Sequence, residues 1–246
     1  MKPEAPFFVG WQGGMTQPTR RALLTGGAGL VAGAGALGLG LGAASPHPGP
    51  GVWDQGKKVA VTGTIYPEPY VHLLTEDLGS GLRPVFLVGA GKDRIDVRPA
   101  LTFTGAAVTG TLIERGEHAM MAVDGIYPDP APGRVRAGPE KDFGEVVITG
   151  EILDAKCWFG AMRPGHGKTH KACAALCAKG GLPLAFCETG RCSDGKGALL
   201  FLNARGKAFG PEILPLVADP VMVRGRIVEV AGLRQMRAAF GDVRRL

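Results

Sequence analysis

Aromatic side chains are scarce in this chain, with 10 Phe, 3 Trp and 3 Tyr among 246 residues. No segment combines aromatic and basic residues in the way that proteins bind single-stranded nucleic acid. The net charge of +6 is modest, and residues of both signs are interspersed along the chain. These features predict a solvated surface and no nucleic-acid partner.

Cysteine is also scarce, at five residues, and the familiar cofactor motifs are missing. The chain has no Cys-x-x-Cys-His, which argues against covalent c-type haem. The paired Cys/His boxes of Rieske clusters are absent. Gly165-His-Gly-Lys-Thr169 ends like a phosphate-binding loop, but Met162 stands where that motif requires glycine. Neither a carboxylate pair nor a Ser-His-Asp arrangement can be placed, so the sequence favours a binding role over an enzymatic one.

Residues 22–44 contain no charged side chain. Their length is sufficient for the hydrocarbon core of a bilayer, which takes roughly 20 apolar residues to cross. The preceding Thr19-Arg20-Arg21-Ala-Leu-Leu resembles a twin-arginine export signal. The arginine pair predicts a cytoplasmic N-terminus, with the rest of the chain on the other side of the membrane.

The same segment leaves open whether it is cleaved or retained. Gly42-Ala43-Ala44 before Ser45 fits a cleavage site. Eight of the 23 residues from 22 to 44 are Gly, which weakens a permanent helix. The long leader with its aromatic residues 7–11 favours retention. We expect an inner-membrane protein facing the periplasm, with a cleaved periplasmic form as the alternative.

One β-rich phrase with glycine at a fixed place recurs four times, at residues 59–65, 107–112, 147–152 and 221–227. Glycine inside a strand marks a bulge or a sharp bend, which is how small barrels turn corners. Each pair of copies encloses an apolar run, at residues 85–88 and 199–202. The pattern predicts a mostly β protein with two tandem small OB-like barrels, and a split sandwich is the alternative.

This organisation divides the chain into six expected segments. They are a cytoplasmic leader (1–21), a twin-arginine-like signal or transmembrane anchor (22–44), a linker (45–56), a first OB-like barrel (57–126), a second linker (127–144) and a second OB-like barrel (145–246).

The second barrel contains an insert that carries cysteine and histidine. Residues 168–179 are expected to form a short helix, with Thr169 capping its start and Gly180 following its end. His170, Cys173 and Cys177 follow the spacing i, i+3, i+7 and share one face of this helix.

Cys157, at the end of the preceding strand, could close over this face. Three thiols and one imidazole would form a four-coordinate Cys₃His set for zinc. The same donors suit iron. Asp154 and Glu151 flank this set, either orienting His170 or facing solvent as ordinary strand residues.

Disulfides are the main alternative to a metal, because an exported protein enters an oxidising compartment. Cys187 and Cys192 flank a short loop and are candidates for one disulfide. A competing scheme pairs Cys157 with Cys173 or Cys177. A direct Cys173–Cys177 bond fits poorly, because the Cβ atoms one turn apart are about 5–6 Å apart, and a disulfide requires about 3.5–4.5 Å. A reactive thiol near His170 or Lys168 is a third hypothesis.

Residues 149–183 resemble a poorly characterised family of small exported or membrane-anchored bacterial OB-like proteins. The matching positions are Thr149, Gly150, Asp154, Cys157, Trp158, Gly160, Lys168, His170, Cys173, Ala174, Cys177, Gly180, Gly181 and Pro183. The resemblance implies that Cys157, His170, Cys173 and Cys177 act together, and it carries no established activity. Cys187 and Cys192 are additions to the family pattern.

Two functions follow as hypotheses. The first is a membrane-tethered, periplasm-facing protein that binds a metal or redox centre through the Cys/His cluster. It would serve as an accessory or electron-transfer subunit beside a membrane-bound oxidoreductase or respiratory complex. The second is a disulfide-stapled structural or adaptor module without a cofactor.

Overall fold

The computed structural model describes residues 16–44, 51–79, 81–131, 133–191 and 197–246. The chain divides into two compact units, Met1–Pro46 and His47–Leu246, which are described separately. The aromatic leader, residues 45–50 of the first predicted linker and Cys192 lie outside the described residues.

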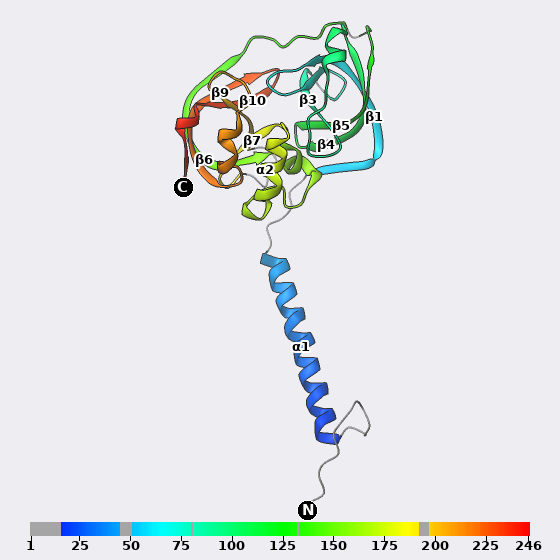
Figure 1. Cartoon of the computed structure of the whole chain (residues 1–246), viewed down its shortest axis with the longest axis vertical. Helices are drawn as coiled ribbons and strands as arrows, with labels where there is room; N and C mark the ends of the chain where they lie inside the picture. Colours follow the sequence, from blue (N-terminus) through cyan, green and yellow to red (C-terminus); the bar gives the residue numbers. More distant parts are fainter. Residues whose placement is uncertain (1–15, 45–50, 80, 132, 192–196) are drawn as a thin grey trace, which may run out of the picture. The chain divides into compact units, whose positions relative to one another are not determined.

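The first unit contains one long helix, α1, at Gln17–Ala44 (Figure 1). Thr16 precedes it and accepts a hydrogen bond from the Thr19 N–H at 3.4 Å, which caps the first turn. No residue of α1 is buried. The helix is long and apolar enough to cross a membrane, and a signal sequence meets the same criteria. The prediction of an apolar N-terminal helix is confirmed.

The second unit begins with a closed barrel, which we call the first barrel. Its strands are β1 (Val52–Tyr66), β2 (His72–Thr75), β3 (Arg83–Val88), β4 (Ala106–Arg115) and β5 (His118–Pro128). They pair in the order β1-β2-β3-β5-β4, and β3 and β5 are parallel. A short helix, η1 (Arg98–Thr102), follows β3. Buried aliphatic side chains such as Leu73, Val85 and Met121 fill the interior.

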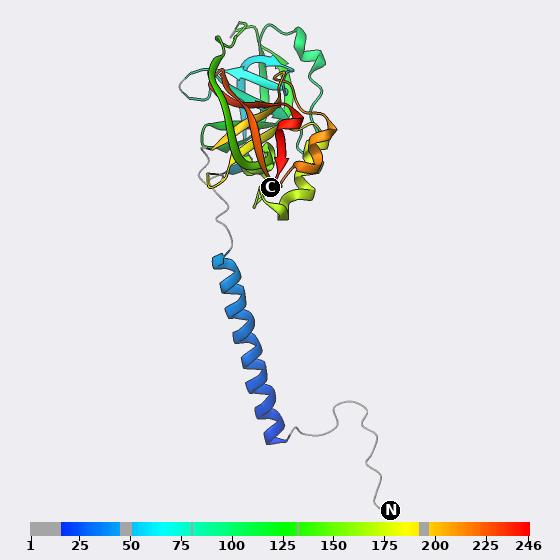
Figure 2. The same cartoon turned by 90° about the vertical axis from the view of Figure 1, so that its left-hand side faces the viewer.

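A six-stranded sheet follows, which we call the second sheet. Its strands are β6 (Lys141–Asp154), β7 (Leu184–Glu188), β8 (Ala198–Asn203), β9 (Pro220–Val230), β10 (Leu233–Ala238) and β11 (Val243–Arg245). The order is β10-β8-β7-β6-β9-β11, and an additional β9–β10 pairing joins five of these strands in a ring. Figure 2 shows β6 beside the orange and red C-terminal strands.

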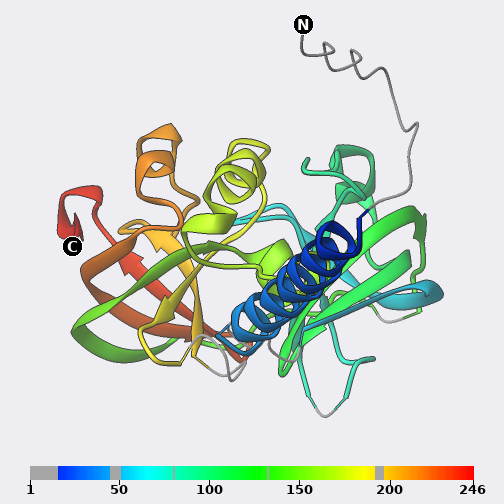
Figure 3. The ribbon, with the colours of Figure 1, turned by 90° about the horizontal axis from the view of Figure 1, so that it is seen from below.

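Helical segments lie between the strands of the second sheet. They are η2 (Cys157–Ala161), η3 (Lys168–His170), α2 (Lys171–Lys179), η4 (Pro211–Leu216) and η5 (Phe240–Asp242). The first barrel and the second sheet share one apolar core, in which Phe86 and Met120 meet Trp158, Leu182 and Leu200. Figure 3 shows them side by side.

The two rings follow the same pairing scheme. The recurring glycine phrase lies in β1, β4, β6 and β9, which are the first and fourth strands of each ring. At Gly63, Gly110, Gly150 and Gly225, a Cβ atom would lie 2.1–2.6 Å from a backbone carbonyl oxygen of a neighbouring strand. Only glycine permits that approach, which explains why the phrase recurs.

Two boundaries differ from those expected. β1 begins at Val52, inside the predicted linker 45–56. The second connection is shorter than 127–144, because β5 continues to Pro128 and β6 begins at Lys141. The connection is held to the barrel at Val135, whose N–H donates to Thr64 Oγ1 at 2.8 Å.

Candidate metal centre

The insert between β6 and β7 begins with a tightly fixed turn. The Ala155 N–H donates to the Pro183 carbonyl at 3.0 Å, and the Lys156 N–H donates to Asp154 Oδ1 at 3.0 Å. Cys157 then opens η2, and the adjacent Trp158 is fully buried. These contacts place the Cys157 thiol at the end of β6, beside the returning helix α2.

The predicted helix at residues 168–179 is present, but its first turn is a 3₁₀ turn. η3 ends at His170, and α2 runs from Lys171 to Lys179. The prediction that Thr169 caps the helix is wrong, because His170 occupies the N-cap position and no side-chain hydrogen bond caps either segment. The end is as predicted: the Gly180 N–H donates to Leu176 O at 2.9 Å.

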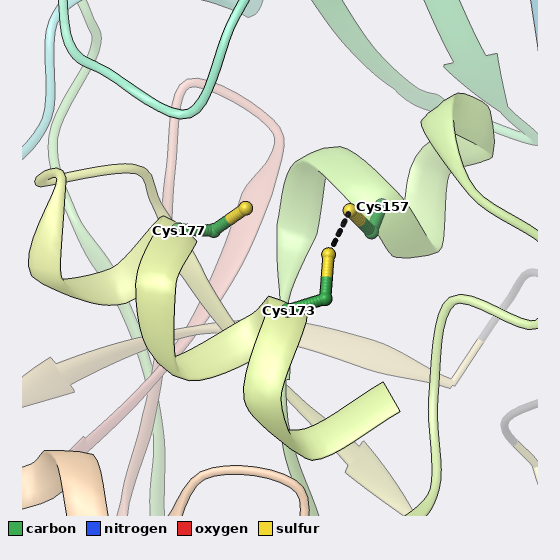
Figure 4. A group of neighbouring side chains, drawn as sticks. All are labelled: Cys157, Cys173 and Cys177. Atoms are coloured by element: carbon green, nitrogen blue, oxygen red, sulfur yellow. Dashed lines mark hydrogen bonds between the residues drawn. The ribbon is translucent and has the colours of Figure 1, made fainter. Parts of the chain in front are cut away.

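Three thiols meet at this place (Figure 4). The sulfur atoms of Cys157, Cys173 and Cys177 all lie within 4.8 Å of one another, and the Cys157–Cys173 distance is 3.8 Å. Cys157 and Cys177 are buried, and Cys173 is half-buried. All three are free cysteines in this structure. The structure therefore brings together the three cysteines that the sequence singled out.

A second group overlaps the first at Cys157. Asp154, Cys157 and His170 have ligand atoms within 4.8 Å of one another, and all three residues are buried. Asp154 Oδ2 and His170 Nε2 lie 3.7 Å apart, too far for a hydrogen bond. Neither atom has a hydrogen-bond partner among the described residues.

His170 therefore does not join all three thiols in one group of the kind the sequence predicted. It belongs with Asp154 and Cys157 instead. Asp154 is fully buried, which corrects its interpretation as a solvent-facing strand residue. Glu151 accepts a hydrogen bond from the Gly167 N–H at 2.6 Å and fixes the loop that leads into η3. Burial raises the pKa of Glu151.

A loop of the first barrel reaches the thiols. It follows β3 and is closed by a bridge between Val88 and Arg94. Lys92 Nζ donates to Cys173 Sγ at 2.7 Å and lies 3.7 Å from Cys177 Sγ. This contact with thiol sulfur raises the pKa of Lys92. At Gly180 a Cβ atom would lie 1.9 Å from Lys92 O, so only glycine allows the loop to lie this close.

Lys156 of the insert holds the same loop in place. Its Nζ donates to three successive carbonyl oxygens, those of Gly89, Ala90 and Gly91, at 2.7, 2.9 and 2.6 Å. Lys156 is only 3% exposed, and burial lowers its pKa. A lysine next to Cys157 therefore holds the loop that places Lys92 beside Cys173.

The thiols differ in acidity. The pKa of Cys157 is raised by its hydrogen bond with Cys177, by burial and by the nearby Asp154 carboxylate. The pKa of Cys177 is lowered by the same hydrogen bond, with Lys92 acting in the same direction. The two shifts are opposite in sign, so the thiol of Cys177 is the more acidic of this pair.

The predicted Cys187–Cys192 disulfide stays a prediction. Cys187 is buried in β7, and Cys192 lies outside the described residues. Sequence reasoning missed the two lysines, and it gave Asp154 only a supporting role. The one sequence signal for a role of Lys156 at the site is that it directly precedes Cys157. Nothing near Lys92 in the sequence connects it with cysteines some 80 positions away.

Comparisons of the chain with protein-family models, with curated proteins and with solved structures find no match.

Proposed function

We propose that this protein binds one zinc or iron ion through Cys157, Cys173 and Cys177, with His170 or Asp154 as the fourth donor. The observation that carries the proposal is that five donor atoms form two groups of three that share Cys157, and that two of the five are buried and have no hydrogen-bond partner in the described part of the chain. Buried polar atoms without partners cost free energy, and a metal ion would remove that cost for the atom that coordinates it.

The spacing of the sulfur atoms supports a tetrahedral ion. Zinc–sulfur bonds of about 2.3 Å in a tetrahedron place the sulfurs about 3.8 Å apart. The Cys157–Cys173 separation in the structure is 3.8 Å. A mixed set of thiolate, imidazole and carboxylate suits zinc and ferrous iron better than magnesium or calcium, which prefer oxygen.

The charges near the site also favour a single divalent ion. Three thiolates and the Asp154 carboxylate would leave two negative charges uncompensated by one such ion. The ammonium groups of Lys92 and Lys156 lie beside the site and supply the two opposing charges. A positive charge close to a negatively charged site lowers the electrostatic free energy of that site.

We also propose an exported, membrane-tethered setting. The twin-arginine-like Arg20-Arg21 and the apolar helix α1 support an N-terminus in the cytoplasm and a site on the periplasmic side of the inner membrane. In this setting the protein would act as an accessory or electron-transfer subunit of a membrane-bound oxidoreductase or respiratory complex. We propose further that both rings are OB-like, which the matching strand order supports.

Elemental analysis of the full chain, purified from membranes without chelators, tests the metal. We expect about one equivalent of zinc or iron per chain. Less than about a tenth of an equivalent of any transition metal would contradict the proposal.

A second candidate function has one observation in its favour. The sulfur atoms of Cys157 and Cys173 lie 3.8 Å apart and could form a disulfide after a small movement. The protein would then be a structural or adaptor module that is stapled by this disulfide. Thiol counting on denatured protein separates the two functions. The metal-binding form contains three thiols at Cys157, Cys173 and Cys177, and the stapled form contains one.

A further inference from the structure

A cavity of about 530 Å³ lies between the first barrel and the second sheet, and none of the five metal-donor residues lines it. Its volume is within the range of roughly 300–1,000 Å³ that is usual for small-molecule sites. It also lies within the second unit, so it does not depend on α1.

One wall of the cavity is aromatic and comes from the first barrel. The rings of Tyr66 and His72 stack with centroids 5.6 Å apart at an interplanar angle of 19°. Phe86 meets His72 edge-on at 6.4 Å and 65°. Another part of the lining is aliphatic and includes Leu200 and Leu233 of the second sheet. A flat ring could pack against these side chains, because aromatic pairs are favourable at centroid distances of about 4.5–7 Å.

The rim of the cavity is positively charged. It is formed by the connection between β5 and β6, which runs from the first barrel to the second sheet (Figure 1). Tyr66 Oη donates to the Val135 carbonyl at 2.7 Å, so the backbone of this connection is fixed at the cavity. Arg134 and Arg136 flank Val135, and both line the cavity.

Neither arginine forms an ion pair within the described ranges of the chain. Glu68 is the one acidic residue in the lining, and its carboxylate pairs with Lys207 Nζ at 3.2 Å. The two guanidinium groups are therefore available to an anion from outside. Guanidinium binds carboxylate in a planar, two-pronged arrangement that lysine cannot reproduce.

We infer that this cavity binds a small aromatic carboxylate, with its ring against the aromatic and aliphatic parts of the lining and its carboxylate paired with Arg134 and Arg136. The inference does not depend on the proposed metal site, because it involves none of the same residues.

Isothermal titration with two probes tests the inference. The full chain is placed in lipid nanodiscs, and empty nanodiscs give the blank. The first probe is 2-naphthoate, and the second is 2-naphthamide, which has the same ring system without the charge. We expect 2-naphthoate to bind at least tenfold more tightly than 2-naphthamide.

Three variants locate the binding. In the double variant Arg134→Gln/Arg136→Gln, we expect the affinity for 2-naphthoate to fall to that for 2-naphthamide. Arg224→Gln, which changes an exposed arginine of β9 outside the cavity, should leave both affinities unchanged. Val230→Trp fills the cavity and should abolish binding of both probes.

The inference is overturned if 2-naphthoate does not bind, or binds no more tightly than 2-naphthamide. It is also overturned if the double arginine variant binds 2-naphthoate as the unmodified protein does. Both arginines are exposed, so their replacement should leave the fold intact. Circular dichroism of the double variant checks this independently.

Discussion

The first barrel and the second sheet use one strand-pairing scheme, yet only one of them carries the thiols. In the first barrel, residues 67–71 connect β1 to β2 as a short turn. In the second sheet, the equivalent connection from β6 to β7 spans residues 155–183 and contains η2, η3 and α2. The difference shows that the site is an addition to the ring, because the ring itself needs only a turn at this place.

The first barrel nevertheless contributes to the site. Its loop after β3 brings Lys92 to Cys173 and is held by Lys156 from the insert. The second sheet and its insert therefore supply the candidate metal ligands, and the first barrel supplies the positive charge of Lys92.

Cys157→Ser should remove the metal site, because Cys157 belongs to both donor groups. We expect the affinity for cobalt, used as a spectroscopic substitute, to fall by roughly 100- to 1,000-fold, since both groups lose their shared ligand. The measurement is a titration that follows the thiolate-to-cobalt charge-transfer band. Ala175→Ser, on α2 between Cys173 and Cys177 and outside both groups, is the control and should bind as the unmodified protein does.

Lys156→Met should disconnect the first barrel from the insert. Three carbonyl oxygens would lose their donor, and we expect the free energy of unfolding to fall by about 2–3 kcal/mol. Urea unfolding of metal-free protein measures this change. The exposed Lys168→Met variant removes the same charge and should change stability by less than about 0.5 kcal/mol. Equal effects of the two variants would show that Lys156 does not anchor the loop.

Lys92→Met tests the charge supplied by the first barrel. With a divalent ion bound by three thiolates, the site has a net negative charge that an ammonium group stabilises. We therefore expect the affinity for cobalt to fall by about three- to tenfold, a modest effect because Lys92 is exposed to solvent. Lys179→Met, an exposed change on α2, should alter it less than about twofold. Tighter binding by the Lys92 variant would reverse the assigned role.

The smallest expected effect is on the pH dependence of stability, and it comes from the first barrel. His118 of the first barrel is 7% exposed and stacks on Phe159 at 5.4 Å. Burial lowers its pKa, with Arg83 and Arg115 acting in the same direction. His118 therefore binds a proton more readily in the unfolded chain than in the folded one. Neutral His118 contributes fully to the free energy of unfolding above its unfolded-state pKa, and this contribution is lost as the pH falls through its folded-state pKa.

His118→Phe keeps the ring and removes the titrating group. Between pH 7.5 and pH 5, we expect the variant to lose less stability than the unmodified protein, by about 1 kcal/mol or less. Urea unfolding of metal-free protein at several pH values measures the difference. Parallel pH profiles for the two proteins would mean that His118 contributes nothing to acid sensitivity.

Much of the fold could be predicted because its signals are local. The uncharged stretch indicates α1, and the recurring glycine phrase indicates the first and fourth strands of each ring. The glycines recur for a steric reason: neighbouring carbonyl oxygens lie where a Cβ atom would be. The apolar runs at residues 85–88 and 199–202 likewise lie in β3 and β8.

The candidate site could be predicted only in part. The helical spacing identified Cys173 and Cys177 correctly, because α2 is regular there. The structure groups His170 with Asp154 and Cys157 rather than with Cys173 and Cys177, so its role as a metal ligand stays a prediction. Lys92 could not be found, since its contact with Cys173 depends on how the first barrel packs against the insert.

The most direct test of the account is X-ray absorption spectroscopy of the full chain at the edge of the metal it contains. We expect three sulfur ligands at about 2.3 Å together with one nitrogen or oxygen ligand at about 2.0–2.2 Å. We also expect the sulfur shell to disappear in Cys157→Ser. A first shell made only of nitrogen and oxygen, or a sulfur shell that persists in Cys157→Ser, would contradict the assignment of Cys157, Cys173 and Cys177 as the metal centre.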